Sequence, residues 1–160
     1  MPAARAAGRA RLLEYDAEDV SMRAAGPCRL REEATVSDET AVVKQAVAVP
    51  GKTVAAGRAT EVQVLLGPDD GAPHFAMRRF VMGEGGGMPR HTNTVEHEQY
   101  VLRGRARITA GDRVHEVKSG DVLYIPAGMP HSYEVVEAPF EFLCLVPNLP
   151  DKLEVLGEGC

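Results

Sequence analysis

The sequence predicts an all-β domain, either a sandwich or a barrel. From Thr40 onward, apolar residues recur in short runs with period two, and turn residues interrupt these runs about every eight to twelve residues. Helical periodicity is nearly absent from the same stretch. The chain has 160 residues, with no visible repeat or linker, and this length suffices for one core. We therefore expect one domain over residues 39–160, preceded by an N-terminal arm over residues 1–38.

The expected strands follow one another with Gly, Pro and Asp residues between them. They cover residues 41–49, 61–66, 74–82, 96–102, 105–109, 113–117, 122–125, 131–136 and 139–146. Ala110-Gly111-Asp112 predicts a hairpin turn, and Arg103-Gly104 predicts another turn. The glycines at 83 and 85–87 do not suit a strand interior, and a change of parity at Arg78-Arg79 indicates a bulge. Residues 151–159 form a short tail that a helix would fit.

Charge and composition limit the partners of the chain. It has 18 basic and 23 acidic residues, which argues against a general affinity for nucleic acid or anionic membranes. It has no apolar run long enough for a transmembrane helix, and its first residues lack the apolar segment of a secretory signal. Its three cysteines form no CxxC pair and are typical of reduced thiols. We therefore expect a cytoplasmic protein with neither a nucleic-acid nor a membrane partner.

Histidines gather in two segments that begin with glycine. The first, residues 85–104, reads GGGMPRHTNTVEHEQYVLRG and holds His91, Asn93 and His97 at positions of one parity. The second, residues 120–131, reads GDVLYIPAGMPH and ends at His131. Alternate residues of a strand point to the same face, so His91 and Asn93 face together. Imidazole suits zinc, iron, copper, nickel and manganese, and the two segments together predict one metal site.

Neighbouring residues complete the predicted site. Glu96 and Glu98 flank His97. Either carboxylate would serve as a further ligand or as a general base if it reaches the pocket. With the histidines pointing inward, strand parity also turns Gln99 and Tyr133 inward, where they would orient a substrate. An apolar floor is expected from Phe80 and Met82, together with either Phe142 or Cys144 of the last strand.

The two segments resemble the sequence motifs of the cupin family. The first family motif runs Gly, five residues, His-x-His, three or four residues, Glu, six residues, Gly. Here Asn93 stands at the second histidine and His97 at the glutamate, while the remaining positions fit: Gly85, His91 and Gly104. The second motif runs Gly, five residues, Pro-x-Gly, two residues, His, three residues, Asn. Here Val135 replaces the final Asn, and the other positions fit: Gly120, Pro126, Gly128 and His131.

The resemblance implies a jelly-roll β-barrel, also called a double-stranded β-helix, with an N-terminal extension. It also implies one divalent transition metal: iron, manganese, copper, nickel or zinc. The expected ligands are His91, His97 and His131, followed by Asn93. An Asn side chain coordinates weakly through its amide oxygen or hydrogen-bonds a metal-bound water.

Small cupins that resemble this chain include dioxygenases, isomerases, epimerases and lyases that act on small organic molecules. A metal with open coordination positions in an apolar barrel binds dioxygen or polarises a carbonyl or enolate oxygen. Because histidine-rich sites suit redox-active metals, we expect an oxygenase or dioxygenase first, and an isomerase, epimerase or lyase second. A non-catalytic module that binds or senses a small ligand is the alternative, which the replacement of a histidine by Asn93 favours. Exposed sheet edges are often covered by a second copy, so we also expect a homodimer.

Overall fold

The computed structural model describes residues 40–157. It confirms the all-β class: this range contains strands and two short 3-10 helices, and no α-helix. The predicted arm over residues 1–38 lies outside the described residues. The elements are η1 (Ala46–Ala48), β1 (Lys52–Thr53), β2 (Arg58–Leu66), η2 (Pro68–Asp70), β3 (Phe75–Asn93), β4 (His97–Ala110), β5 (Arg113–Lys118), β6 (Val122–Ile125), β7 (His131–Pro147) and β8 (Leu153–Val155). Between residues 40 and 157, no helix is long and apolar enough to cross a membrane.

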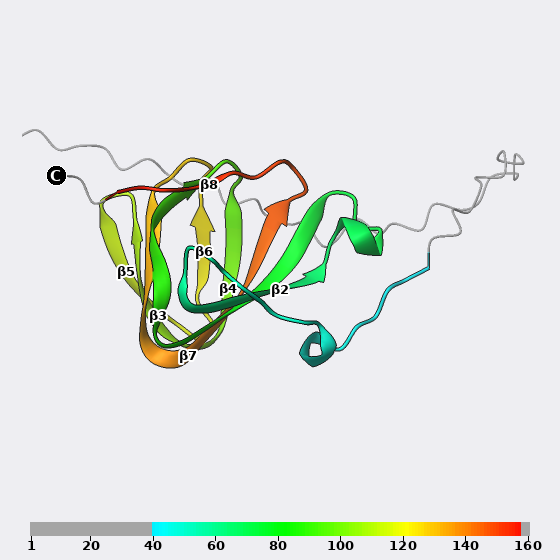
Figure 1. Cartoon of the computed structure of the whole chain (residues 1–160), viewed down its shortest axis with the longest axis horizontal. Coiled ribbons are helices and arrows are strands. Elements are labelled where there is room, and N and C mark those ends of the chain that lie inside the picture. The colour runs from blue at the N-terminus through cyan, green and yellow to red at the C-terminus, as the bar shows by residue number, and fades with distance from the viewer. Residues whose placement is uncertain (1–39, 158–160) are drawn as a thin grey trace, which may run out of the picture. The chain divides into compact units, whose positions relative to one another are not determined.

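The described strands join in one antiparallel network that wraps around a common interior (Figure 1). Their order is β1-β2-β3-β7-β4-β5, with β6 pairing to β4 and β8 pairing to β3. The three longest strands, β3, β7 and β4, are neighbours at the centre of this order. The end of β3 pairs with the start of β7, so that His91 lies opposite His131. Strand β4 begins at His97. The topology therefore brings the two predicted segments together.

Strand β4 shows how alternation and one glycine shape the barrel. Its buried residues have odd numbers in the first half and even numbers in the second: His97, Gln99, Val101, Ala106 and Ile108. The parity changes at Gly104, where φ is 77° and the pairing to β7 shifts register. A Cβ atom on this residue would lie 2.3 Å from the Pro139 carbonyl oxygen, so only glycine fits. The turn predicted at Arg103-Gly104 is thus a bulge inside one continuous strand.

Two further boundary predictions were wrong for a related reason. The glycines at 83–87 lie inside β3 as an irregular stretch, with a register shift between Met82 and Gly87. Gly87 runs so close to β7 that a Cβ atom would lie 2.2 Å from the Tyr133 carbonyl oxygen. Likewise β7 runs unbroken over residues 131–147 instead of splitting in two. Bulges let long strands bend around the interior where the sequence pattern suggests turns.

Three local predictions were also wrong. The strand expected over residues 41–49 is replaced by η1 and extended chain, and its side chains find no partner sheet: Val43 is 90% exposed. The irregularity expected at Arg78-Arg79 lies in the opposite strand, between Val64 and Leu66 of β2. Of the tail expected over residues 151–159, the described part (151–157) forms β8 instead of a helix, because it pairs with the end of β3. This pairing brings the chain after β7 back to the site.

Within the described residues, the buried polar side chains gather in one place. Apolar residues fill the interior, and four of them are fully buried: Met82, Val101, Ala106 and Phe140. Six polar residues are buried as well: Thr60, His91, Asn93, His97, Gln99 and His131. All of these except Thr60 line the same cavity. Burying polar groups costs free energy unless they are paired, so their concentration marks a candidate site.

Candidate functional site

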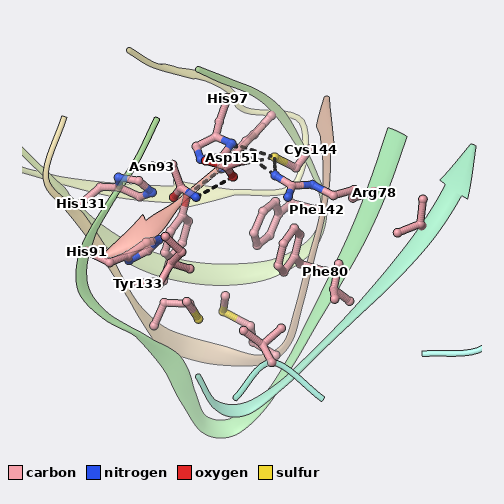
Figure 2. Close-up of a pocket in the computed structure, with 17 residues that line it drawn as sticks. Arg78, Phe80, His91, Asn93, His97, His131, Tyr133, Phe142, Cys144 and Asp151 are labelled. Atoms are coloured by element: carbon pink, nitrogen blue, oxygen red, sulfur yellow. Dashed lines mark hydrogen bonds between the residues drawn. The ribbon is translucent and has the colours of Figure 1, made fainter. Parts of the chain in front are cut away.

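A cavity of about 330 Å³ lies in the barrel interior, with walls from β2, β3, β4 and β7 (Figure 2). A volume near the lower end of the usual range for ligand pockets suits a small organic molecule. Its apolar wall includes residues of several strands: Val62, Val64, Phe80, Met82, Met88 and Phe142. Its polar wall contains the residues predicted from the two histidine segments: His91, Asn93, His97, Gln99, His131 and Tyr133.

The three histidines come from three different strands and meet at this wall. The ring centroids of His91 and His131 are 4.2 Å apart, and those of His97 and His131 are 5.5 Å apart. Each ring is nearly buried, with at most 4% of the residue exposed. Figure 2 shows all three on the same side of the cavity as Asn93. The structure therefore brings side chains of both segments to one wall of the cavity.

Backbone carbonyls hold two of these imidazoles in one tautomer. His91 Nδ1 lies 2.8 Å from the Pro89 carbonyl oxygen, and His131 Nδ1 lies 2.8 Å from the Met129 carbonyl oxygen. A carbonyl oxygen only accepts, so each Nδ1 carries the hydrogen and each Nε2 keeps its lone pair. Burial lowers the pKa of His91, and it lowers the pKa of His131 to about 4. Both rings are therefore neutral near pH 7 and have Nε2 available as a ligand atom.

His97 is held differently, by side chains instead of backbone. Arg78 Nη2 lies 3.3 Å from His97 Nδ1, and Cys144 Sγ lies 3.5 Å from the same nitrogen. Because a guanidinium only donates, Nδ1 accepts and the hydrogen of the neutral ring sits on Nε2. Burial, and next the charge of Arg78, lowers the pKa of His97 to about 3. His97 is thus neutral, but in the tautomer opposite to that of the other two rings.

Asn93 is oriented by a carboxylate that the sequence did not predict. Its Nδ2 donates to Asp151 Oδ2 at 2.8 Å, which turns the amide oxygen away from that carboxylate. The other oxygen of Asp151 accepts from the Thr94 backbone N–H at 3.0 Å. Asp151 follows β7 and precedes β8, so the pairing of β8 with β3 brings it to the cavity. The strand pattern of the sequence holds no signal for this approach.

Gln99 and Tyr133 lie where strand parity predicted them. Gln99 Nε2 donates to the Tyr133 hydroxyl oxygen at 2.6 Å, and burial raises the pKa of Tyr133. Gln99 Oε1 and Arg78 Nε are buried without a hydrogen-bond partner among residues 40–157. Tyr133 also stacks on Phe142, which stacks on Phe80, with centroid separations of 5.5 Å and 5.0 Å. These groups provide hydrogen bonds and a stack of aromatic rings for a ligand.

Glu96 and Glu98 do not reach the cavity. The odd-numbered residues of β4 point inward in this half of the strand, so Glu98 faces outward and is exposed. Glu96 accepts a hydrogen bond from the Tyr124 hydroxyl at 3.1 Å, on the outer surface. The expectation that one of them supplies a ligand or a base is not met by this geometry. The charged groups that do line the cavity are Arg78 and Asp151.

Arg78 is the second site residue that the sequence analysis missed. A usable signal existed, because it shares parity with Phe80 and Met82, both expected on the cavity floor. The interpretation of Arg78-Arg79 as a bulge obscured that signal. In the structure β3 alternates regularly here: Arg78 lines the cavity, whereas Arg79 forms an ion pair with Glu141.

The donor set fits a divalent transition metal in part. As the side chains stand, no group of three His, Cys, Asp or Glu residues between 40 and 157 is arranged to hold a metal ion. Two neutral imidazoles with free Nε2 atoms are nevertheless in place, and Asn93 adds an oxygen donor. His97 would join them after giving up its contact with Arg78. The chemistry of the donors suits zinc, iron, copper, nickel or manganese.

Comparison with known proteins identifies the fold family. The sequence model of the cupin domain family matches residues 78–146, a range that includes every histidine of the site. The chain contains a cupin domain. Its structure is similar to a polyketide cyclase of Streptomyces resistomycificus, with 28% identity, 74% of this chain and 89% of that chain covered, and a TM-score of 0.67. It is also similar to a cupin-2 domain protein of Rhodospirillum rubrum, with 26% identity, 69% and 74% coverage, and a TM-score of 0.59.

Two further similarities are narrower. A predicted oxalate decarboxylase of Thermotoga maritima shares the cupin fold with a TM-score of 0.60 at 20% identity, covering 68% of this chain and all of that chain. At that identity the likeness concerns the fold alone. An uncharacterised protein of Methanocaldococcus jannaschii is 40% identical over 52 residues. That match spans 32% of this cupin-domain chain and 42% of the relative.

Proposed function

We propose that this chain is a metal-dependent enzyme that acts on a small, mostly apolar organic molecule. The supporting observation is the meeting of His91, His97 and His131 at the wall of one aromatic-lined cavity. Because burial lowers the pKa of each, the three rings are neutral near pH 7 and do not repel a cation. A bound iron, manganese, copper, nickel or zinc ion would supply Lewis-acid activation of a substrate oxygen and, if redox-active, a site for dioxygen.

The chain's own residues have distinct parts in this proposal. His91 and His131 are the first two ligands, since their Nε2 lone pairs are already free. His97 becomes the third when its hydrogen moves to Nδ1 and its contact with Arg78 ends. Asn93 contributes its amide oxygen or holds a water, and Asp151 keeps the amide oriented.

The rest of the cavity binds and orients the substrate. Phe80 and Phe142 exclude water from one side, which strengthens electrostatic interactions inside. Burial raises the pKa of Tyr133, so its hydroxyl stays protonated and acts as a hydrogen-bonding group instead of a base. Gln99 Oε1 has no partner within the described residues and is available to accept from a substrate hydroxyl or N–H.

Two reaction classes are compatible with these parts. The first is an oxygenase or dioxygenase, which requires a redox-active metal beside the histidines. The second is carbonyl or enolate chemistry without net oxidation, as in an isomerase, epimerase or lyase. The likeness to a protein named as a polyketide cyclase supports a substrate with carbonyl oxygens in either class. The identity of the metal would separate the two classes.

Elemental analysis of protein purified without chelator or affinity-tag metal tests the proposal. We expect about one transition-metal ion per chain in the wild type, and its loss in His91→Gln and His131→Gln. His115→Gln is the matched control, since it removes an exposed imidazole of β5 that does not line the cavity. A wild-type protein that is empty and also fails to bind added zinc or cobalt contradicts the proposal.

A metal-free ligand-binding module is the second candidate. One observation favours it, namely the contact of Arg78 with His97 Nδ1, which keeps the third imidazole in the tautomer unsuited to ligation through Nε2. For such a module, the protein would bind no added cobalt, and treatment with EDTA would leave its ligand affinity unchanged. An enzyme of the first kind would lose turnover after treatment with EDTA.

A further inference from the structure

The cavity contains a positive charge, on Arg78, that forms no ion pair with a described carboxylate; Asp151 lines the same cavity but hydrogen-bonds Asn93 and Thr94 instead. Arg78 Nη2 lies 3.3 Å from both His97 Nδ1 and Cys144 Sγ, and both acceptors are neutral groups. No Asp or Glu between residues 40 and 157 forms an ion pair with this guanidinium. Its Nε is buried without a hydrogen-bond partner in that range. The adjacent Arg79, on the other face of β3, pairs with Glu141.

A stack of aromatic rings lies beside this charge. The rings of Tyr133, Phe142 and Phe80 are parallel, with interplanar angles of 3° and 6° between neighbours. The guanidinium carbon of Arg78 lies 5.4 Å from the Phe80 ring centroid, within the range of a cation–π contact. Figure 2 shows Arg78 beside Phe80 and Phe142, across the cavity from His91 and His131. A planar conjugated ring matches such a row better than a bulky aliphatic group does.

A second unpaired polar atom points to a ligand with two kinds of group. Gln99 is 5% exposed, its Nε2 is engaged by Tyr133, and its Oε1 has no partner within the described residues. Buried polar atoms without partners are uncommon in native structures. A ligand that offers an acceptor to Arg78 and a donor to Gln99 would satisfy both positions.

We propose that the cavity binds a planar, conjugated organic anion, with its ring beside the Phe80–Phe142–Tyr133 row and its carboxylate, enolate or phenolate oxygen at Arg78. The inference rests on the proposed function in one respect, namely that this cavity is the substrate site. Arg78 is then the residue that selects anions. A neutral ligand of the same shape leaves the guanidinium without a counter-charge, and a cationic ligand is repelled by it.

Calorimetric titration with a matched pair of probes tests this selection. Naphthoate and naphthamide have the same planar ring and differ in charge, and the protein is first treated with EDTA so that no metal contributes. We expect naphthoate to bind the wild type about 10- to 100-fold more tightly than naphthamide, as a charged hydrogen bond provides. In Arg78→Gln this ratio falls to about one while naphthamide affinity stays within about threefold, and Arg78→Lys restores most of the ratio.

Arg79→Gln is the matched control, because it removes the neighbouring arginine from the outer face and should leave the ratio unchanged. Cyclohexanecarboxylate tests planarity and should bind at least about tenfold more weakly than naphthoate. Equal binding of naphthoate and naphthamide to the wild type, or no binding of either, overturns the proposal. So does a ratio that persists in Arg78→Gln. If Arg78→Gln does not fold, the ratio of naphthoate to naphthamide affinity in the wild type decides whether the cavity selects anions.

The two proposals fail separately. Anion selection by metal-free protein, together with a wild type that holds no metal, refutes the proposed metal enzyme and supports the anion site. A metal-loaded wild type without anion selection in its EDTA-treated form refutes the anion site and leaves the metal enzyme standing.

Discussion

The cavity holds its histidines in two different ways. His91 and His131 each donate from Nδ1 to a carbonyl oxygen two residues earlier in the chain, so the backbone orients these rings. His97 is oriented by the side chains of Arg78 and Cys144. The backbone contacts leave Nε2 ready to bind a cation, whereas the Arg78 contact places the hydrogen on Nε2. His91 and His131 therefore offer the lone pairs that the proposed metal would need, and Arg78 offers the charge that the proposed anion would need.

Under the two proposals, His97 links two ligands with opposite charge. When Arg78 is drawn to an anionic ligand, its contact with His97 Nδ1 weakens, and the ring is free to change tautomer. A metal and an anion in the same cavity would then favour each other's binding. The following substitutions test whether the two kinds of histidine differ as their contacts suggest.

The largest expected effect is on metal affinity. His131→Gln removes a backbone-oriented ligand and should weaken cobalt binding by more than about 100-fold, while His97→Gln should weaken it by only about tenfold. Cobalt titration followed by visible absorption measures both variants. His115→Gln serves as the control, since that side chain is exposed. If both variants lose cobalt affinity equally, the rings oriented by backbone and the ring oriented by side chains do not differ as metal ligands.

Acid should destabilise the metal-free protein through the same rings. An unperturbed histidine has a pKa of 6.5, whereas burial lowers the pKa of His131 to about 4 and that of His97 to about 3. Between these values the unfolded chain binds more protons, so the free energy of unfolding falls as pH drops from 6.5 toward 4. The contribution of His131, fully present above pH 6.5, is about 3 kcal/mol.

Urea denaturation of metal-free protein at pH 7, 6 and 5 follows this loss. The slope against pH should be smaller in His131→Gln than in the wild type, and His115→Gln should behave like the wild type. Identical pH slopes in His131→Gln and the wild type would mean that His131 titrates normally in the folded protein.

Removing Arg78 should strengthen metal binding. In Arg78→Met the positive charge is gone and His97 Nδ1 loses its donor, so the ring can adopt the tautomer with a free Nε2. We expect cobalt to bind about tenfold more tightly, from one charge–charge repulsion and one tautomer preference. The titration used for His131→Gln measures it, with Arg79→Met as control. Weaker cobalt binding in Arg78→Met would assign Arg78 a supporting role instead of a competing one.

The smallest effect is expected at Asn93. Asn93→Ala removes the hydrogen bond to Asp151 and should lower the free energy of unfolding by about 1 kcal/mol. Cobalt affinity should change by less than about threefold, because an amide oxygen is a weak ligand for these metals. Thermal unfolding and the same titration provide both values. A loss of cobalt affinity as large as in His131→Gln would make Asn93 a full ligand.

The sequence was most informative where a motif and strand parity act together. The spacing around His91, His97 and His131 predicted that they share one site, and parity placed Gln99 and Tyr133 beside them. Parity is reliable there because β4 and β7 are buried on one face and alternate strictly near these residues. The same rule, applied to Glu98, places it outside the barrel, as the structure does.

The missed residues depended on contacts between distant parts of the chain. Asp151 reaches Asn93 only because β8 pairs with β3, and nothing local in residues 151–159 encodes that pairing. The strand ends were missed for a similar reason: Gly87 and Gly104 resemble turn residues, yet each lies in a bulge against the backbone of another strand. A glycine that permits close approach and a glycine that permits a turn look alike in sequence.

The part of the cavity wall that comes from β2 can change its shape without changing the polar residues of the site. Val62 and Val64 line it from a strand that carries none of the imidazoles and no arginine of the site. Among the strands of residues 40–157, only the two-residue strand β1 lies beyond it. Val64 is 48% exposed, so exchanges there meet little steric resistance from the core. Mutational libraries confined to these two positions would reshape the accepted molecules while the reactive groups stay in place. Under the proposed function, ligand shape and chemistry would therefore depend on different residues.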